Sequence, residues 1–319
     1  MRAKSHGRKP AGDLAERIVS DANGTVIAVF GRRYEVETDA GECLDCVARG
    51  KKREAACGDR VTVQATGPAQ GVINAILPRT SYLERADAYK HKAIAANADQ
   101  LLVLVAVDPW FSDEFVTRVL LLAHAAGIKT LIALNKIDLP GVGAARDRLA
   151  VFARAGHRVI EIAVKPRTGD AGTAAAPLGT AELAVQLQGH ATVLAGQSGM
   201  GKSSLVNALI PGAAAVTGEI SLALGAGRHT TTFSRRYRID LQSTLIDCPG
   251  MQEVGIHNLD VATLTTGFTD FTPFLDDCRF ANCRHDREPG CGLTAALAAG
   301  RVDARRHELF CKFRGEIGA

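Results

Sequence analysis

Between residues 24 and 83 the chain carries short runs in which apolar and polar residues alternate, the period of half-buried β-strands. These runs occupy Thr25–Phe30, Arg33–Thr38, Asp59–Ala65 and Gly71–Leu77. Turn residues separate them, for example Gly31-Arg32 and Gly67-Pro68. Several short strands within about 60 residues predict a small β-barrel, and the oligonucleotide-binding (OB) type is one candidate.

From Ala98 onward the pattern changes to buried apolar strands that alternate with helices. The predicted strands are Gln100–Val107, Lys129–Leu134, Arg158–Ala163, Ala191–Ala195 and Thr244–Asp247. One helix is capped by Ser112 and stopped by Gly127, and a second covers Ala144–Ala155. This alternation predicts an α/β domain with a mostly parallel sheet and helices on both faces. Residues 166–181 are rich in Gly, Ala, Pro and Thr, which indicates a flexible linker.

Composition narrows the class of protein. The chain has 319 residues, of which 46% are hydrophobic and 23% charged, as in globular proteins. No apolar run reaches the roughly 18–20 residues of a membrane span, and the basic N-terminus has no apolar core after it, so we expect a cytoplasmic protein. Residues 1–22 are mostly polar and basic, so we expect them to form a disordered arm.

The net charge of +4 is modest, but the basic residues gather in clusters. They lie at 2–9, at 49–53 and, near the end, at Arg279, Arg284, Arg287, Arg301, Arg305, Arg306, Lys312 and Arg314. Such clusters suggest an anionic partner such as nucleic acid, although solvated surface explains any single cluster equally well.

A phosphate-binding loop follows the strand Ala191–Ala195. Its residues match G-x-x-x-x-G-K-[ST], and a helix begins immediately after them. The expected nucleotide contacts are Gly196, Gln197, Ser198, Gly199, Met200, Gly201, Lys202, Ser203 and Ser204. Backbone N–H groups at a helix N-terminus cradle phosphates, Lys202 reaches the β- and γ-phosphates, and the Ser203 hydroxyl ligates Mg²⁺.

Two further motifs indicate guanine rather than adenine. Asp247-Cys248-Pro249-Gly250 matches D-x-x-G, in which Asp247 meets Mg²⁺ through water and the Gly250 N–H meets the γ-phosphate. Asn135-Lys136-Ile137-Asp138 matches N-K-x-D, in which the Asp138 carboxylate accepts two guanine N–H groups that adenine lacks. The base-reading motif precedes the phosphate loop, so the motif order of a typical GTPase is circularly permuted.

The segment Gly227–Thr232 lies between the phosphate loop and Asp247 and has the composition of a mobile switch. Thr231 or Thr232 is expected to complete the Mg²⁺ shell, with Thr231 preferred. Many GTPases place Gln directly after D-x-x-G to orient the attacking water, but here that position is Met251. His229 is therefore the candidate catalytic residue, with a surface loop histidine as the alternative.

Cysteines and one histidine near the C-terminus predict a metal site. Cys278, Cys283, His285 and Cys291 have the spacing C-x4-C-x-H-x5-C, and three thiolates with one imidazole suit a closed structural zinc site. His307 and Cys311 are nearby residues that could compete as ligands. The lone C-x-x-C of Cys43 and Cys46 is interpreted as small residues in or near a β-turn, with metal or redox use as a minor alternative.

The combined features resemble the ribosome small-subunit-dependent GTPase family RsgA, also called YjeQ. The residues that carry this resemblance are Phe30–Tyr34, Arg49–Arg53, Cys57–Val61, Ala95–Asp99, the phosphate loop, Gly227–Thr232 and Cys278–Cys291. The resemblance implies an OB barrel (23–85), a permuted GTPase domain (90–272) and a zinc module (273–319). The base-backing loop of the family looks like Ala163-Val164-Lys165 here, which departs from its usual Ser-Ala-Lys-like sequence.

The same resemblance implies a function. The chain is expected to bind the small ribosomal subunit and its 16S rRNA as a monomer during late maturation, and to hydrolyse GTP to GDP when that subunit stimulates it. The family histidine that aligns with His229 serves catalysis. Two alternatives stay open at this point: an rRNA-binding module in which hydrolysis is incidental, and a phosphate-loop ATPase or kinase.

Overall fold

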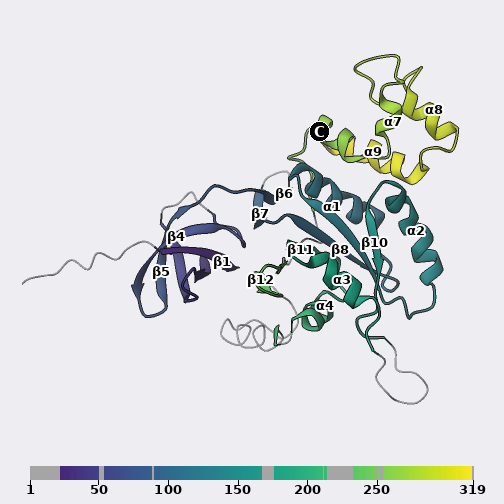
Figure 1. Ribbon diagram of the computed structural model, residues 1–319. Coiled ribbons are helices and arrows are strands. Elements are labelled where there is room, and N and C mark those ends of the chain that lie inside the picture. The colour runs from purple at the N-terminus through teal and green to yellow at the C-terminus, as the bar shows by residue number, and fades with distance from the viewer. Residues whose placement is uncertain are drawn as a thin grey trace, which may run out of the picture.

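The computed structural model describes residues 22–49, 54–87, 90–166, 176–210, 212–213, 233–248, 251 and 254–317. Within these ranges, one 11-stranded sheet runs in the order β10-β9-β8-β11-β13-β12-β1-β2-β3-β5-β4. Figure 1 shows the barrel strands at one end, the helix-covered strands in the middle and the C-terminal helices above them. The predicted N-terminal arm falls outside the described residues except for Ala22, which begins β1.

The N-terminal part is a small barrel, as the sequence pattern predicted, but it has five strands where the pattern gave four. They are β1 (Ala22–Phe30), β2 (Arg33–Thr38), β3 (Cys43–Ala48), β4 (Arg60–Gly67) and β5 (Gln70–Ile76). The barrel closes because β1 pairs antiparallel with both β2 and β4, while β3 pairs parallel with β5. Alternate residues such as Val26, Val36 and Val63 fill a core of its own.

Strand β3 holds the two cysteines that were expected in or near a β-turn. Both lie on the strand, because residues 43–47 pair with β2, and Cys43 begins it just after the turn at residues 39–41. Cys46 is fully buried in the barrel core, whereas Cys43 is exposed. Side chains three positions apart on a strand point to opposite faces, so these two thiols cannot share a metal.

A hairpin connects the barrel to the central sheet. It comprises β6 (Tyr82–Asp87) and β7 (Lys90–Ala96), which pair antiparallel as a separate two-stranded sheet. The sequence pattern did not predict these strands. They span the positions 85 and 90 between which the first domain boundary was expected.

The central sheet is mostly parallel, as predicted. Strands β8 (Gln100–Ala106), β9 (Lys129–Asn135), β10 (Arg158–Glu161), β11 (Ala191–Ala195) and β13 (Thr244–Asp247) run parallel, and β12 (Ser234–Arg238) pairs antiparallel with β13. Every residue of β8 is buried, because helices cover both faces of the sheet.

The helices of this domain are α1 (Asp113–Ala125), α2 (Val142–Arg154), α3 (Thr180–Leu187) and α4 (Lys202–Leu209). Ser112 caps α1 as predicted, and its side chain accepts a hydrogen bond from the Phe115 N–H at 3.2 Å. Helix α3 was not predicted. It begins inside the expected linker, and Leu178 before it already pairs with Ala163, so the end of that linker is structured.

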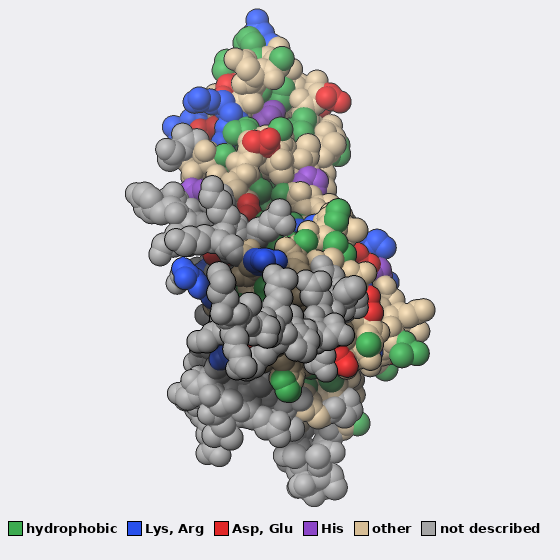
Figure 2. Space-filling view, turned by 90° about the vertical axis from the view of Figure 1, so that its left-hand side faces the viewer, with side chains coloured by type: hydrophobic (Ala, Val, Ile, Leu, Met, Phe, Trp, Pro, Cys, Tyr) green, Lys and Arg blue, Asp and Glu red, His purple; other side chains and the backbone are tan. Residues whose placement is uncertain are grey.

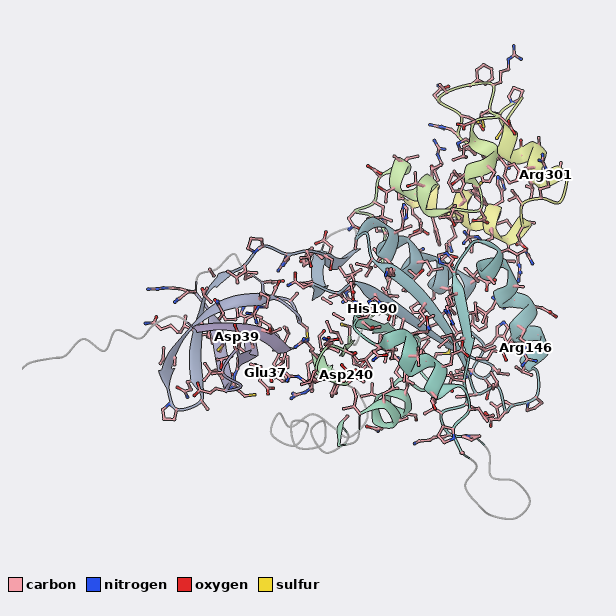
Figure 3. The ribbon with its side chains drawn as sticks, viewed as in Figure 1. Glu37, Asp39, Arg146, His190, Asp240 and Arg301 are labelled. Carbon is pink, nitrogen blue, oxygen red and sulfur yellow. The ribbon has the colours of Figure 1, made fainter. Side chains whose placement is uncertain are left out.

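Strand β12 joins the barrel to the central sheet. Ala28 and Val29 of β1 pair antiparallel with Arg235 and Ser234. Ion pairs to β2 reinforce this join: Arg235 with Glu35 at 3.0 Å and Arg238 with Glu37 at 3.0 Å. Figure 3 shows Glu37 on the barrel side that faces this strand.

The C-terminal part contains α6 (Val261–Gly267), α7 (Thr272–Leu275), α8 (Gly292–Ala298) and α9 (Ala304–Ile317). Four buried phenylalanines form its core against the central domain: Phe268, Phe271, Phe310 and Phe313. Arg306 is buried among them and pairs with Asp270 at 2.6 Å, so it does not belong to the exposed basic cluster. None of the described helices is long and apolar enough to cross a membrane.

Candidate functional site

The predicted phosphate loop lies where β11 ends and α4 begins, at the carboxyl edge of the parallel strands. Gly201 is the N-cap of α4 with φ 98°, and a Cβ there would lie 2.4 Å from the Asn135 side-chain amide. Gly199 has φ 79°, and a Cβ there would lie 3.0 Å from the Pro109 ring. Both positions need glycine because of the left-handed backbone and the close neighbours. The first-turn N–H groups of α4 face this edge, as anion binding requires.

Lys202 and Asp247 supply the opposite charges of the site. The Lys202 ammonium donates to the carbonyls of Gly196 at 2.7 Å and Gln197 at 3.0 Å, so it lies over the loop. Burial lowers the pKa of Lys202 and raises the pKa of Asp247, and each charge partly offsets this shift in the other. Asp247 lies beside the loop because β13 pairs with β11, with Leu194 opposite Asp247.

Asn135 connects three loops of the site. Its Nδ2 donates to the carbonyl of Met200 in the phosphate loop at 2.9 Å, and its Oδ1 accepts the Lys136 N–H at 2.8 Å and the Val164 N–H at 3.2 Å. Asn135 is only 3% exposed. The side chain therefore uses both polar atoms to hold the protein together, which explains why this position in N-K-x-D needs an amide.

Lys136 and Asp138 follow Asn135 at the edge where β9 ends. Lys136 has φ 62°, a left-handed conformation that non-glycine residues rarely adopt, and its ammonium donates to the carbonyl of Asp108. The Ile137 N–H donates at 3.3 Å to the carbonyl of Ile162, the residue just after β10, which holds the loop against the end of that strand. The motif that comes first in the chain thus lies beside the phosphate loop in space, because β9, β8 and β11 are neighbours in the sheet.

Several predicted site residues lie outside the described residues. These are Gly250 of the D-x-x-G motif and the switch segment 227–232, which includes His229, Thr231 and Thr232. Met251 is described and is buried, so the side chain at the usual glutamine position faces the core. Ser203 lies at the start of α4 and is exposed, so it is accessible to a bound ion.

Sequence reasoning missed one wall of the site, the segment Asp108–Ser112 after β8. Pro109 packs against Gly199, the Asp108 carbonyl holds Lys136, and the Ser112 N–H donates to the Gln197 side chain at 3.0 Å. The available signal was Asp108-Pro109 directly after a buried parallel strand, since side chains at that edge line ligand sites.

The C-terminal cluster has the geometry of a metal centre. The ligand atoms of Cys278, Cys283, His285 and Cys291 all lie within 4.8 Å of one another. His285 Nδ1 lies 3.4 Å from the Cys278 sulfur and 3.8 Å from the Cys291 sulfur. The Gly292 N–H donates to the Cys278 sulfur and the His285 N–H to the Cys283 sulfur, which stabilises thiolates. Three thiolates and one imidazole fit a tetrahedral metal ion.

The two residues that could compete as ligands stay outside this cluster. His307 Nε2 lies 2.7 Å from the carbonyl oxygen of His285, and the Cys311 sulfur lies 3.9 Å from an Asp286 oxygen. His307 therefore contacts the backbone of a candidate ligand and lies outside the cluster that could hold a metal.

Comparisons with known proteins agree with this architecture. The family model described as RsgA GTPase matches residues 76–257. A protein of Burkholderia pseudomallei named small ribosomal subunit biogenesis GTPase RsgA is 47% identical over 306 residues, which cover 95% of this chain and 94% of that protein. A protein of the same name from Ralstonia nicotianae is 46% identical over 299 residues, 92% of each chain.

Two solved structures share the fold. The crystal structure of YjeQ from Thermotoga maritima has a TM-score of 0.69 and 26% identity, and the match covers 94% of this chain and 99% of that one. The structure of YloQ, described as a circularly permuted GTPase, has a TM-score of 0.65 at 24% identity, with 96% and 98% of the two chains covered. Sequence, fold and permuted motif order therefore lead to one conclusion: the chain belongs to the RsgA family of GTPases.

Proposed function

We propose that this GTPase binds GTP at the site described above and uses its hydrolysis as a timed step on the small ribosomal subunit. The observation that carries the binding site is the Asn135 side chain, which joins the phosphate loop, the N-K-x-D loop and the Val164 segment. A shared brace of this kind fixes the distance between the phosphate and base positions. Asp138, three residues further on, is proposed to accept the two guanine N–H groups.

The same edge would hold Mg²⁺. Ser203 and Asp247 would bind it with Thr231, and the ion would neutralise charge on the β- and γ-phosphates. The Lys202 ammonium stabilises charge on the phosphates, and the loop N–H groups add to this effect. His229 is proposed to orient the attacking water, because the side chain at the position after D-x-x-G, Met251, is apolar and buried.

Exposed basic residues on the C-terminal module support a nucleic-acid partner. Figure 2 shows blue Lys and Arg side chains gathered on the upper part of the molecule, where this module lies. The exposed members are Arg279, Arg284, Arg287, Arg301, Arg305 and Lys312. Together with the names of the relatives, this charge favours the small ribosomal subunit and its 16S rRNA as partner. A partner of this kind implies a cytoplasmic location.

The metal of the C-terminal centre is proposed to be Zn²⁺. The four ligands leave no open coordination position, so the ion would be structural rather than catalytic. We also propose that residues 23–85, 90–272 and 273–319 act as the barrel, GTPase and zinc modules, and that the chain works as a monomer.

Turnover measured with and without small subunits tests this function. We expect subunits to raise the kcat for GTP at least tenfold, while large subunits added as a control leave it unchanged. If nucleotide binds but subunits do not change kcat, the protein is instead an rRNA-binding module in which hydrolysis is incidental.

A further inference from the structure

Gln197 occupies one of the variable positions of the phosphate loop, yet its side chain turns away from the loop. Its Oε1 accepts the N–H of Ser112 at 3.0 Å, across 85 positions of sequence. Ser112 is the N-cap of α1, and Pro109 of the same segment packs against Gly199. The phosphate loop is therefore held from outside by the residues that begin α1.

The first turns of α1 also hold the C-terminal helix α9. Glu114 accepts from Lys312 at 2.7 Å, and Asp113 pairs with Arg305 at 3.7 Å. Glu114 is shared, because Arg118 also donates to it at 2.8 Å. The three residues from Ser112 to Glu114 thus contact the phosphate loop on one side and α9 on the other.

Arg118 strengthens the second contact. Its guanidinium donates to Glu316 of α9 at 2.7 Å and lies 4.6 Å over the ring of Phe313. Its side chain is only 14% exposed, so water screens these charges weakly. Burial lowers the pKa of Arg118, but Glu316 and Glu114 outweigh this effect and the net shift is upward. A half-buried network of this kind is worth more than an isolated surface pair.

We propose that Gln197 is a positioning residue that couples the phosphate loop to α9 through the first turn of α1. This proposal rests on the proposed function, in which the loop binds the phosphates of GTP or GDP. In the structure, residues 108–114 contact the phosphate loop and helix α9 at the same time. Nucleotide that orders the loop then favours docking of α9, and by linkage a docked α9 raises nucleotide affinity by the same factor. Nucleotide binding would in this way change how α9, and with it the zinc module, docks on the GTPase domain.

A double-mutant cycle on the full-length protein tests the coupling. GDP affinity is measured by titration with a fluorescent GDP derivative for the parent, Gln197→Ala, Lys312→Ala and the double variant. We expect each single substitution to weaken binding about threefold to tenfold, and the double variant to lose less than the product of the two. Arg60→Ala, which breaks a comparable 2.7 Å surface pair with Asp39 in the barrel, serves as the control and should leave affinity unchanged.

Hydrogen exchange adds a readout that a purely structural role of Gln197 would not move. In the parent, GDP should slow exchange of the α9 amides, and Gln197→Ala should abolish this slowing while α9 remains folded. If Lys312→Ala leaves GDP affinity unchanged, or GDP does not protect α9 in the parent, the coupling is refuted. If the parent binds no GDP at all, the proposed function fails instead, so the two failures are distinguishable. Protection of α9 by GDP is measured in the parent protein, so this test does not depend on whether a variant folds.

Discussion

The Asn135 side-chain amide donates to the Met200 carbonyl at 2.9 Å, a bond that joins two motifs 65 residues apart and reversed in chain order. Permutation leaves this bond possible because β9 and β11 lie on either side of β8 in the sheet. The site depends on the spatial order of the strands, and the chain can be opened elsewhere when its ends lie near each other.

Asn135→Ala should weaken GDP binding by tenfold or more. The substitution removes three hydrogen bonds and leaves the buried Met200 carbonyl and Val164 N–H without them, at about 1–3 kcal/mol for each group. Isothermal titration calorimetry gives the affinity, and thermal unfolding without nucleotide separates binding loss from instability. Asn258→Ala, which loses one 3.4 Å bond to Glu84 at the surface, is the matched control. Equal GDP affinity in the two variants would contradict the role of the Asn135 hydrogen bonds in holding the site together.

His229→Ala should leave nucleotide affinity unchanged and slow subunit-stimulated turnover by about a hundredfold, the usual scale for a lost positioned proton acceptor or donor. Single-turnover hydrolysis of GTP on small subunits measures this step. His257→Ala changes a histidine elsewhere in the chain and should retain the parent rate. Parent-like turnover in His229→Ala would show that this histidine is an ordinary surface residue.

Metal analysis should find one zinc ion per chain. Cys283→Ser should lose this zinc, because it removes one of four ligands, whereas Cys311→Ser should retain it, because that thiol lies outside the cluster. Chelation should expose the amides of α8 to exchange, since the ligand Cys291 caps this helix. A zinc-free protein with α8 fully protected would refute the structural role of the metal.

His157 should make stability depend on pH. Burial, with a contribution from Arg306, lowers its pKa to about 4, and its Nδ1 lies 2.9 Å from the Thr130 hydroxyl. The unfolded state therefore binds more protons between pH 6.5 and 4, so stability falls as the pH decreases through this window. Between pH 7 and 5 the loss should be about 2 kcal/mol.

Denaturant unfolding of the parent and of His157→Gln at the two pH values measures this loss. The variant has no titrating group at this position, so its stability should change less over the same interval. His190→Gln, which removes a histidine just before β11 that lies 2.7 Å from Asp99, is the control. If the free energy of unfolding changes equally with pH in the parent and in His157→Gln, His157 is not the source of the pH dependence.

Local signals predicted the elements whose own residues determine them. Ser112 caps α1 where expected, and the apolar strands β8, β9, β11 and β13 lie within a residue of their predicted bounds. Strand β12 was missed because its sequence is charged. Arg235 is buried there only because Glu35 of the barrel pairs with it, a partner 200 positions away. The bond between Gln197 and Ser112 was unpredictable for the same reason.

The candidate metal ligands were predictable because four residues with coordinating atoms fall within 14 positions, so the cluster needs no partner that is distant in the sequence. The guanine contacts are harder to predict from sequence. A carboxylate that follows a strand, as Asp138 follows β9, can bind the base only if the surrounding loops place the base beside it. The barrel was predicted from alternation, yet the residues Cys43–Ala48 were not, because small and acidic residues weaken the strand signal there.

Nucleotide specificity of the parent and of Asp138→Asn tests the account most directly. We predict that the parent binds GDP at least a hundredfold more tightly than ADP. Asp138→Asn should lose this preference and gain affinity for xanthosine diphosphate, whose base carries a carbonyl oxygen where guanine carries its amino group. Equal affinity of the parent for GDP and ADP would contradict the claim that the permuted motifs assemble one guanine-nucleotide site.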